Sequence, residues 1–382
     1  MKKLLAIMCA VIVMVSVVTI ASGSQKTMAA EGEQMPEQYN LGFVTLSTAG
    51  SFFGNVYGIV NELCDLTGAV LVSDVGAISP EEQITSVKNV ISAGANAVIF
   101  INFTEDCLPK IADLCEENQV YWGQYARNVD NPEIKEYLDN SKYYIGRIYN
   151  DDSFIAQKAL ESFQENGVTK VGIVGPATGD TATDLRDHYF QDHAAEYGIE
   201  VVAVVRDLTD AASATDAVSN IIATNSDLGG IYCISGSDSR GEGVMNAIDI
   251  LGANDQVKVV MSDFFDGMDA YFDNGTIISS FGGSYPDVVF LTVLLLNQIS
   301  GTPLGNTEGE SIVLELPYVQ VNDSEELNEY LSYCESGTDY AYNAEEMSKM
   351  IGYYNPDITL DDIKEIMANY SLADVKARHD NQ

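Results

Sequence analysis

The sequence predicts an α/β protein with two lobes, each built on a doubly wound parallel sheet. From Tyr39 onward, short apolar runs alternate with amphipathic stretches of helical length, and this alternation is typical of βαβ units. It comes in two successive series, the second of which begins near Tyr143. The 382 residues also exceed what one compact core usually holds. Two series in a chain of this length therefore predict two lobes.

The first series predicts strands at 41–46, 69–72, 97–101 and 120–123. The third of these runs is apolar throughout, as in a strand that is buried on both faces of its sheet. The clearest helix start is Ser79, followed by Pro80 in the first turn and by Glu82 three residues after the serine. Ser and Glu at this spacing form a capping box, in which each side chain accepts from the other residue's backbone N–H.

The second series predicts strands at 144–148, 170–174, 200–205, 230–234 and 257–261. A strand at 276–280 and a long apolar helix at 288–299 follow, and residues 311–321 alternate in the manner of a strand. Beyond Asn322 the chain becomes acidic and rich in tyrosine. Thr359 caps a last helix with one apolar face, so we expect this extension to be ordered and packed against the body.

The N-terminus has the pattern of a secretory signal. Lys2 and Lys3 precede an uninterrupted apolar run, and small residues follow it. Residues 1–30 are therefore a signal peptide or, alternatively, an uncleaved anchor, because the apolar stretch approaches the minimum length of a spanning helix. No cysteine follows the run at the position that a lipoprotein requires. We expect an exported protein, either periplasmic or at the cell surface and possibly tethered there.

Charge and composition exclude several classes of partner and chemistry. The net charge of −38 argues against nucleic acid and against an anionic membrane surface. No phosphate-binding glycine loop or dinucleotide fingerprint is present, and His188 and His193 are spaced wrongly for adjacent zinc ligands on a helix. We therefore predict no cofactor, no metal and no enzymatic activity. The alternative in this class is an exported hydrolase that uses Asp151 or Asp152.

Five cysteines follow the signal, namely Cys64, Cys107, Cys115, Cys233 and Cys334. An odd number cannot pair completely within one chain. We expect buried free thiols.

Candidate ligand-binding residues lie where strands end, because ligands of doubly wound sheets bind at the carboxyl ends of the strands. These segments are 47–53, 124–127, 151–153, 178–186, 235–240 and 262–266. They combine aromatic, carboxylate, hydroxyl and arginine side chains, Asp152 among them. Aromatic faces match the C–H faces of a sugar ring, and Asp and Arg each bind two neighbouring hydroxyls. The mixture favours a sugar.

Three of these stretches resemble the periplasmic-binding-protein type 1 family, in the sugar-binding branch that includes ribose-binding protein. Ser51-Phe52-Phe53 is similar to the family's Pro-Phe-Phe entry to the first helix. Residues 91–101 are similar to the stretch before its third strand, and residues 259–263 are similar to its Val-Val-Gly-Phe-Asp strand end. The resemblance runs from about residue 39 to residue 322.

The resemblance assigns roles to several residues. It implies that Phe52 and Phe53 stack on the ligand ring, and that Asp263 binds ligand hydroxyls. Ser237 and Asp238 fall where the family usually has Asn-Asp.

Other positions depart from the ribose-binding pattern. Arg127 falls near the family's Asp-Arg pair, but Tyr125 and Ala126 stand where the aspartate is expected. Asp184 aligns with a ligand-contacting arginine and Arg186 lies two residues on, while Gly283 replaces a common glutamine. The resemblance thus implies a sugar, although not a pentose bound in the ribose pose.

The family's architecture implies that three crossing segments form a hinge, near Asn150, Gly283 and Gly309. Lobe one then comprises 39–150 plus 284–309, lobe two 151–283 plus 310–322, and residues 323–382 form an acidic helical extension. Ligand contacts to both lobes close the cleft.

The implied partners are a small-molecule ligand and the permease of an ABC importer. One alternative is a module that presents its ligand to a membrane sensor. Others are a nucleoside, an autoinducer or an amino acid as ligand, the last of which needs Arg127, Arg186 or Arg240 to point into the cleft. A transcription regulator shares this fold, but it needs a basic helix-turn-helix where this chain has a signal.

Overall fold

The computed structural model describes residues 34–237, 239–305, 311–335 and 340–380. The expected signal or anchor at 1–30 and the candidate Asp238 lie outside these residues. Within them, no helix is long and apolar enough to cross a membrane.

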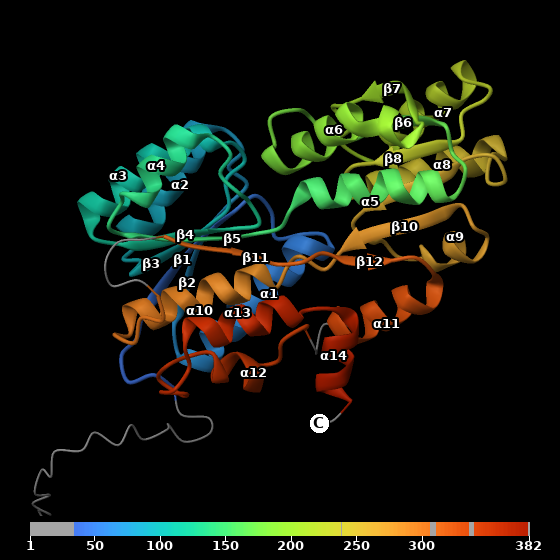
Figure 1. Ribbon diagram of the computed structural model, residues 1–382. Helices are drawn as coiled ribbons and strands as arrows, with labels where there is room; N and C mark the ends of the chain where they lie inside the picture. The colour runs from blue at the N-terminus through green and yellow to red at the C-terminus, as the bar shows by residue number, and fades with distance from the viewer. Residues whose placement is uncertain (1–33, 238, 306–310, 336–339, 381–382) are drawn as a thin grey trace, which may run out of the picture.

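Lobe one is a six-stranded parallel sheet between two layers of helices (Figure 1). The strands, in spatial order, are β11 (Ile312–Glu315), β5 (Tyr144–Tyr149), β4 (Tyr121–Tyr125), β3 (Ala97–Phe100), β1 (Asn40–Thr45) and β2 (Val70–Val75). One face carries α2 (Pro80–Ser92), α3 (Leu108–Asn118) and α4 (Pro132–Asp139). The other face carries α1 (Ser51–Thr67) and α10 (Asp287–Ile299). The predicted capping box at Ser79 is confirmed, with both reciprocal hydrogen bonds formed.

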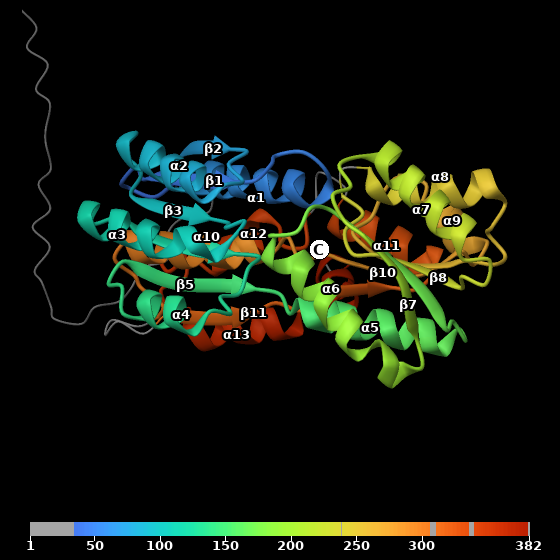
Figure 2. The same cartoon turned by 90° about the horizontal axis from the view of Figure 1, so that it is seen from above.

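Lobe two repeats this architecture with a single antiparallel edge strand. Its strands, in spatial order, are β12 (Val319–Val321), β10 (Ile277–Gly282), β9 (Lys258–Ser262), β8 (Gly230–Cys233), β6 (Lys170–Val174) and β7 (Glu200–Val205). One face packs against α5 (Asp152–Glu165) and α6 (Thr181–His193). The other packs against α7 (Ala211–Thr224), α8 (Arg240–Leu251) and α9 (Asp269–Asp273). The predicted fold class is confirmed, and Figure 2 shows the two lobes side by side.

Three segments carry the chain between the lobes. The first joins β5 to α5 at Asn150, and the second joins β10 to α10. The third differs from the expected crossing near Gly309, because β11 pairs with β5 in lobe one and β12 pairs with β10 in lobe two. Residues 311–321 alternate as one strand, but Pro317 lies in the middle and cannot donate to a ladder. The chain therefore changes sheets there, and residues 311–315 belong to lobe one.

The C-terminal extension is ordered in its described residues, as expected. It consists of α11 (Ser324–Cys334), α12 (Ala344–Lys349), α13 (Leu360–Asn369) and α14 (Leu372–His379). Thr359 caps α13 as predicted, and Ile363 and Met367 on that helix are buried. The expectation that α13 is the last helix is wrong, since Ser371 caps the short α14 after it. Figure 1 shows the extension on the side of the molecule opposite the gap between α4 and α6.

All five cysteines of the described chain are buried free thiols, as predicted.

Candidate ligand-binding site

A cavity of about 510 Å³ lies between the lobes, where the carboxyl ends of the two sheets face each other. Both lobes line it. Six of the predicted residues are among its lining residues, namely Phe52, Phe53, Arg127, Arg186, Ser237 and Asp263. Its volume suits a ligand of small-molecule size.

Aromatic rings form much of the wall that lobe one contributes. Phe52 and Phe53 begin α1 directly after the turn that follows β1, and their rings meet edge to face with centroids 5.0 Å apart. Phe103, in the loop after β3, adds a third ring to the lining. Aromatic faces of this kind cover the C–H surface of a ligand without supplying charge.

Asp263 is the polar centre of the wall in lobe two. Its backbone is left-handed, with φ of 73°, and its N–H donates to the Phe281 carbonyl at 2.7 Å. The hydroxyls of Ser237 and Ser235 donate to the carboxylate oxygen Oδ2 at 2.6 and 3.2 Å. Its other oxygen, Oδ1, accepts from no side chain among the described residues. Two serine hydroxyls thus fix the orientation of this carboxylate.

An ion pair connects the two lobes across the cavity. Arg127, after β4, donates from Nη2 to Asp180 Oδ2 at 2.8 Å, and both side chains are largely buried. Asp180 is also the N-cap of α6, accepting from the Thr183 N–H at 3.0 Å. Burial opposes ionisation of Asp180, but the Arg127 guanidinium holds the pKa of this carboxyl below its usual value. The Thr181 N–H adds an interlobe bond of 3.4 Å to the Phe103 carbonyl.

The second arginine of the site is neutralised within the protein. Arg186 donates from Nε to Asp152 Oδ1 at 2.8 Å and from Nη1 to the Ile234 carbonyl at 2.8 Å. The Tyr318 hydroxyl, on the third crossing segment, donates to the same Asp152 oxygen at 2.9 Å. Asp152 therefore does not line the cavity itself. It holds the Arg186 side chain in place and balances its charge.

Besides Asp152, three predicted residues of the described chain do not line the cavity, namely Tyr125, Asp184 and Gly283. Tyr125 is fully buried beneath it, its hydroxyl 2.8 Å from Thr45 Oγ1. Asp184 accepts from the Gly179 N–H at 2.7 Å and pairs with Arg206 at 2.9 Å. Asp184 fills a structural role because α6 begins at Thr181, so its N-cap Asp180 is the aspartate that lines the cavity.

Gly283 lies behind the cavity, at the hinge. Its φ is 71°, and a Cβ there would come within about 3 Å of Val319, Tyr330 and Tyr370. Its carbonyl accepts from the Tyr370 hydroxyl at 2.6 Å. This position has no room for the glutamine that is common in the family.

Other lining residues were not singled out from the sequence, among them Phe103, Asn150, Asp180, Thr183, Thr209, Ser284 and Tyr318. Asp180 and Thr183 lie in the strand-end segment 178–186, and a helix cap directly after a strand was the signal that could have identified Asp180. Asn150 Oδ1 and Arg127 Nε are buried and have no hydrogen-bond partner among the described residues.

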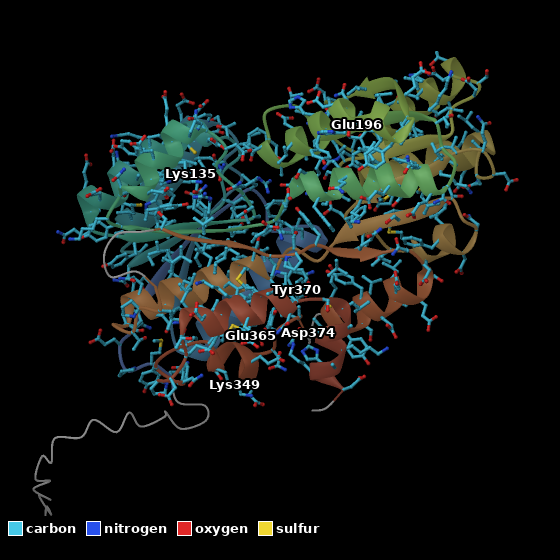
Figure 3. The ribbon with its side chains drawn as sticks, viewed as in Figure 1. Lys135, Glu196, Lys349, Glu365, Tyr370 and Asp374 are labelled. Atoms are coloured by element: carbon cyan, nitrogen blue, oxygen red, sulfur yellow. The ribbon has the colours of Figure 1, made fainter. Side chains whose placement is uncertain are left out.

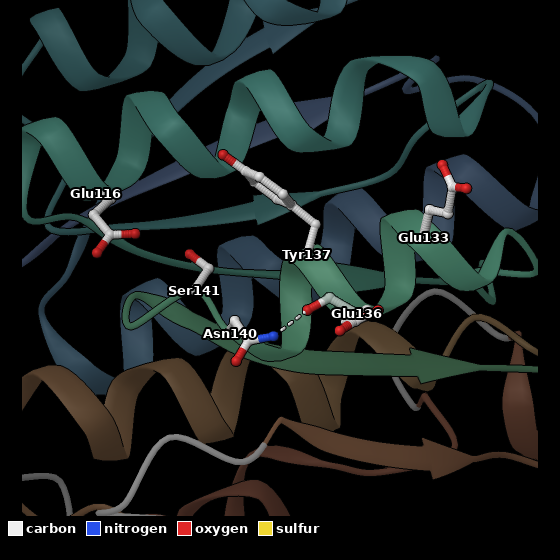
Figure 4. Close-up of a pocket in the computed structure, with 6 residues that line it drawn as sticks. All are labelled: Glu116, Glu133, Glu136, Tyr137, Asn140 and Ser141. Atoms are coloured by element: carbon white, nitrogen blue, oxygen red, sulfur yellow. Dashed lines mark hydrogen bonds between the residues drawn. The ribbon is translucent and has the colours of Figure 1, made fainter.

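A second, shallower pocket lies between α3 and α4 (Figure 4). It is lined by Glu116, Glu133, Glu136, Tyr137, Asn140 and Ser141. Its carboxylates diverge, and nowhere in the described ranges do three His, Cys, Asp or Glu side chains gather closely enough to hold a metal ion.

Two parallel-sheet lobes, three crossing segments and a ligand-sized cavity between the strand ends define a two-lobed solute-binding protein. The chain belongs to the periplasmic binding protein domain family, whose model matches residues 41–303. The predicted resemblance is thereby confirmed. No curated protein matched the chain.

Solved structures share the fold at low sequence identity. A sugar ABC transport substrate-binding protein from Bordetella parapertussis 12822 is 16% identical over 77% of this chain and 92% of its own, with a TM-score of 0.63. A periplasmic solute-binding protein from Actinobacillus succinogenes 130z, with bound D-allose, is 18% identical over 76% and 100%, with a TM-score of 0.64. A periplasmic ribose ABC transporter protein from Conexibacter woesei DSM 14684 is 17% identical over 79% and 98%, with a TM-score of 0.62.

Proposed function

We propose that this protein is exported, captures a sugar in the cavity between its lobes and delivers it to an ABC importer, without catalysing a reaction. The observation that carries the proposal is the environment of Asp263. Its carboxylate is oriented by two serine hydroxyls, keeps one oxygen that accepts from no side chain in the described part of the chain, and belongs to a cavity that Phe52 and Phe53 also line. A ligand with adjacent hydroxyls and an apolar ring face matches this combination.

The charge balance of the cavity favours a neutral ligand. Arg127 is paired with Asp180, and Arg186 with Asp152. Arg240 donates to the Ser235 carbonyl and to the Ser235 hydroxyl. An amino-acid ligand needs a cation for its carboxylate, and taking Arg127 or Arg186 would leave the buried Asp180 or Asp152 without its partner.

The environments of Asp151 and Asp152 disfavour the hydrolase alternative. Asp151 caps α5 by accepting from the Ser153 N–H at 2.9 Å. Asp152 is committed to Arg186 and Tyr318. Glycoside hydrolysis needs two carboxyl groups that face the scissile bond, whereas both of these already serve the protein.

A thermal-shift screen tests the ligand class. Protein lacking residues 1–30 is melted with separate monosaccharides, nucleosides and amino acids. We expect one or more sugars to raise Tm, because a ligand at 100 times its Kd stabilises a folded protein by about 2.7 kcal/mol. A rise with amino acids or nucleosides and none with sugars contradicts the proposal.

A transport assay tests the second half of the proposal. The producing cell is fractionated to locate the protein, and uptake of the radiolabelled sugar is compared with and without the gene. We expect the protein outside the cytoplasm and slower uptake without it. Normal uptake in cells that lack the protein contradicts delivery to an importer.

A further inference from the structure

The C-terminal extension divides into two halves that sit on different lobes. The first half, α11 and α14, lies on lobe two. Ser324 donates to Asp273 Oδ1 beside α9 at 2.5 Å, and the Tyr330 ring lies 4.7 Å from that of Phe264, centroid to centroid. Phe264 is the residue directly after the candidate ligand-binding Asp263.

The second half, α12 and α13, lies on lobe one. The Tyr354 hydroxyl donates to the Leu66 carbonyl at the end of α1 at 3.0 Å. Asn297, fully buried on α10, donates to the Met350 carbonyl at 3.0 Å and accepts from the Gly352 N–H at 2.6 Å. This buried amide thus holds the second half to lobe one.

Charged side chains join the two halves to each other. Arg378 on α14 is paired with Glu346 on α12, and its guanidinium lies 4.5 Å from the centre of the Tyr342 ring. Its Nη2 also donates to the Ala341 carbonyl at 2.7 Å, and His379 lies 3.3 Å from Glu346. Arg378 and Glu346 are both mostly buried, which strengthens a charge pair relative to one in water.

The extension also contacts the hinge between the lobes. Tyr370 separates α13 from α14 and donates to the Gly283 carbonyl on the second crossing segment at 2.6 Å. The buried Tyr285 hydroxyl, on the same segment, donates to the Cys334 carbonyl and accepts from the Ala341 N–H. Figure 3 places Tyr370 between the crossing segments and the rest of the extension. The extension thus fastens both lobes and the hinge.

We propose that the extension is a brace that holds the lobes in the arrangement in which Arg127 meets Asp180, and so limits opening of the cleft. A hinge rotation moves one lobe relative to the other. Because each half of the extension is anchored to one lobe, such a rotation must break the Glu346–Arg378 link, the Tyr370–Gly283 bond or the anchors themselves. The free energy of these contacts therefore favours the closed arrangement.

The brace alters the equilibrium that a ligand has to shift. A ligand that binds only the closed arrangement loses apparent affinity in proportion to the fraction of open molecules. By raising the closed fraction before ligand arrives, the brace raises affinity without touching the ligand.

A distance measurement between the lobes tests the brace without any ligand, so its outcome is independent of the proposed function. Lys135 and Glu196 are exposed on opposite lobes (Figure 3). Both are replaced by cysteine and spin-labelled in protein lacking residues 1–30, whose five native thiols are buried. In the otherwise unchanged chain we expect one short, narrow distance distribution from double electron–electron resonance.

Glu346→Gln, with Glu345→Gln as its matched control, separates the brace from a general charge effect. Glu345 pairs with Lys349 on its own helix, whereas Glu346 links the halves. Glutamine at position 346 still completes the capping box with Asn343. We expect the E346Q distribution to lengthen and broaden, with at least a threefold larger open fraction, and the E345Q distribution to stay unchanged.

Tyr354→Phe provides a second test, because it removes the hydroxyl that donates to the Leu66 carbonyl and keeps the ring. Melting curves identify the variants that remain folded. If folded E346Q and Y354F both keep the parent distribution, the extension does not brace the lobes and the proposal is wrong.

Discussion

The Arg127 guanidinium of lobe one lies 2.8 Å from the Asp180 carboxylate of lobe two. The pair joins the lobes at the cavity, while the C-terminal extension joins them on the opposite side of the hinge. Contacts on both sides of the hinge thus favour the same arrangement.

Asp180→Asn is expected to open the cleft. Asparagine is as good a helix N-cap as aspartate, so α6 persists while Arg127 loses its counter-charge. Removing one charge of a buried ion pair destabilises a protein by roughly 3–5 kcal/mol, because the other charge stays buried without a partner. Separation of the lobes reduces this cost, because water then hydrates the Arg127 guanidinium. Small-angle scattering should show a larger radius of gyration without ligand. Asp184→Asn, which loses a pair inside lobe two, serves as the control and should leave the radius unchanged.

Asp263→Asn is expected to weaken ligand binding without unfolding the protein. Asparagine tolerates the left-handed backbone at this position, but it loses the charge that strengthens bonds to ligand hydroxyls. A hydrogen bond to a charged group contributes about 1.5–3 kcal/mol, so affinity should fall about 10- to 100-fold. Titration calorimetry measures this affinity, with the sugar that gives the largest rise in Tm as the ligand. Unchanged affinity would remove Asp263 from the site.

Glu335 makes stability depend on pH. Burial raises its pKa to about 7, and the negative charge of Asp263 contributes, although the hydrogen bond from the Tyr330 hydroxyl acts in the opposite direction. The folded state therefore holds this proton more tightly than the unfolded chain, whose carboxyl has a pKa of 4.5. The destabilising contribution is absent below pH 4.5, grows as pH rises and is complete above about 7, where it reaches about 3 kcal/mol.

Glu335→Gln should remove this contribution. We expect the variant to unfold at higher denaturant concentration than the parent at pH 8, and at a similar concentration at pH 4.5. An equal difference between variant and parent at both pH values would show that Glu335 does not titrate in this range.

Gly283→Ala is expected to destabilise the protein and loosen the hinge. A left-handed alanine costs of order 1–3 kcal/mol, and its Cβ would also meet Val319, Tyr330 and Tyr370. Chemical denaturation measures the loss of free energy of unfolding. Gly252→Ala is the control, because Gly252 is also left-handed but an added Cβ there meets open space. Equal losses in both variants would mean that only backbone strain, and no contact at the hinge, is involved.

The fold could be predicted because its strands are buried apolar runs and its helices begin at recognisable caps such as Ser79. The third crossing could not, because residues 311–321 keep one alternation although Pro317 divides them between two sheets. Strand ends identified segments that line the cavity, and these segments include Phe52 and Asp263. Asp180 was not singled out within the segment 178–186, because only the start of α6 at Thr181 shows which aspartate caps the helix at the cavity.

The packing of the C-terminal extension could be predicted only in part from the sequence. An amphipathic helix after Thr359 implies that something covers its apolar face, and Ile363 and Met367 are indeed buried. The pattern does not identify the covering surface. That depends on contacts between distant residues, such as the one between Asn297 and Met350, which no local periodicity contains.

The five buried cysteines can report on unfolding, because each thiol becomes accessible to reagents only when the structure around it opens. Burial raises the pKa of the Cys64, Cys107 and Cys334 thiols to about 12, so at neutral pH they are protonated and unreactive. Cys107 and Cys115 lie in the core of lobe one, Cys233 lies in that of lobe two, and Cys334 is a buried residue of the extension itself. Pulse alkylation followed by peptide mass spectrometry can therefore time, thiol by thiol, whether the lobes and the extension come apart together or in sequence.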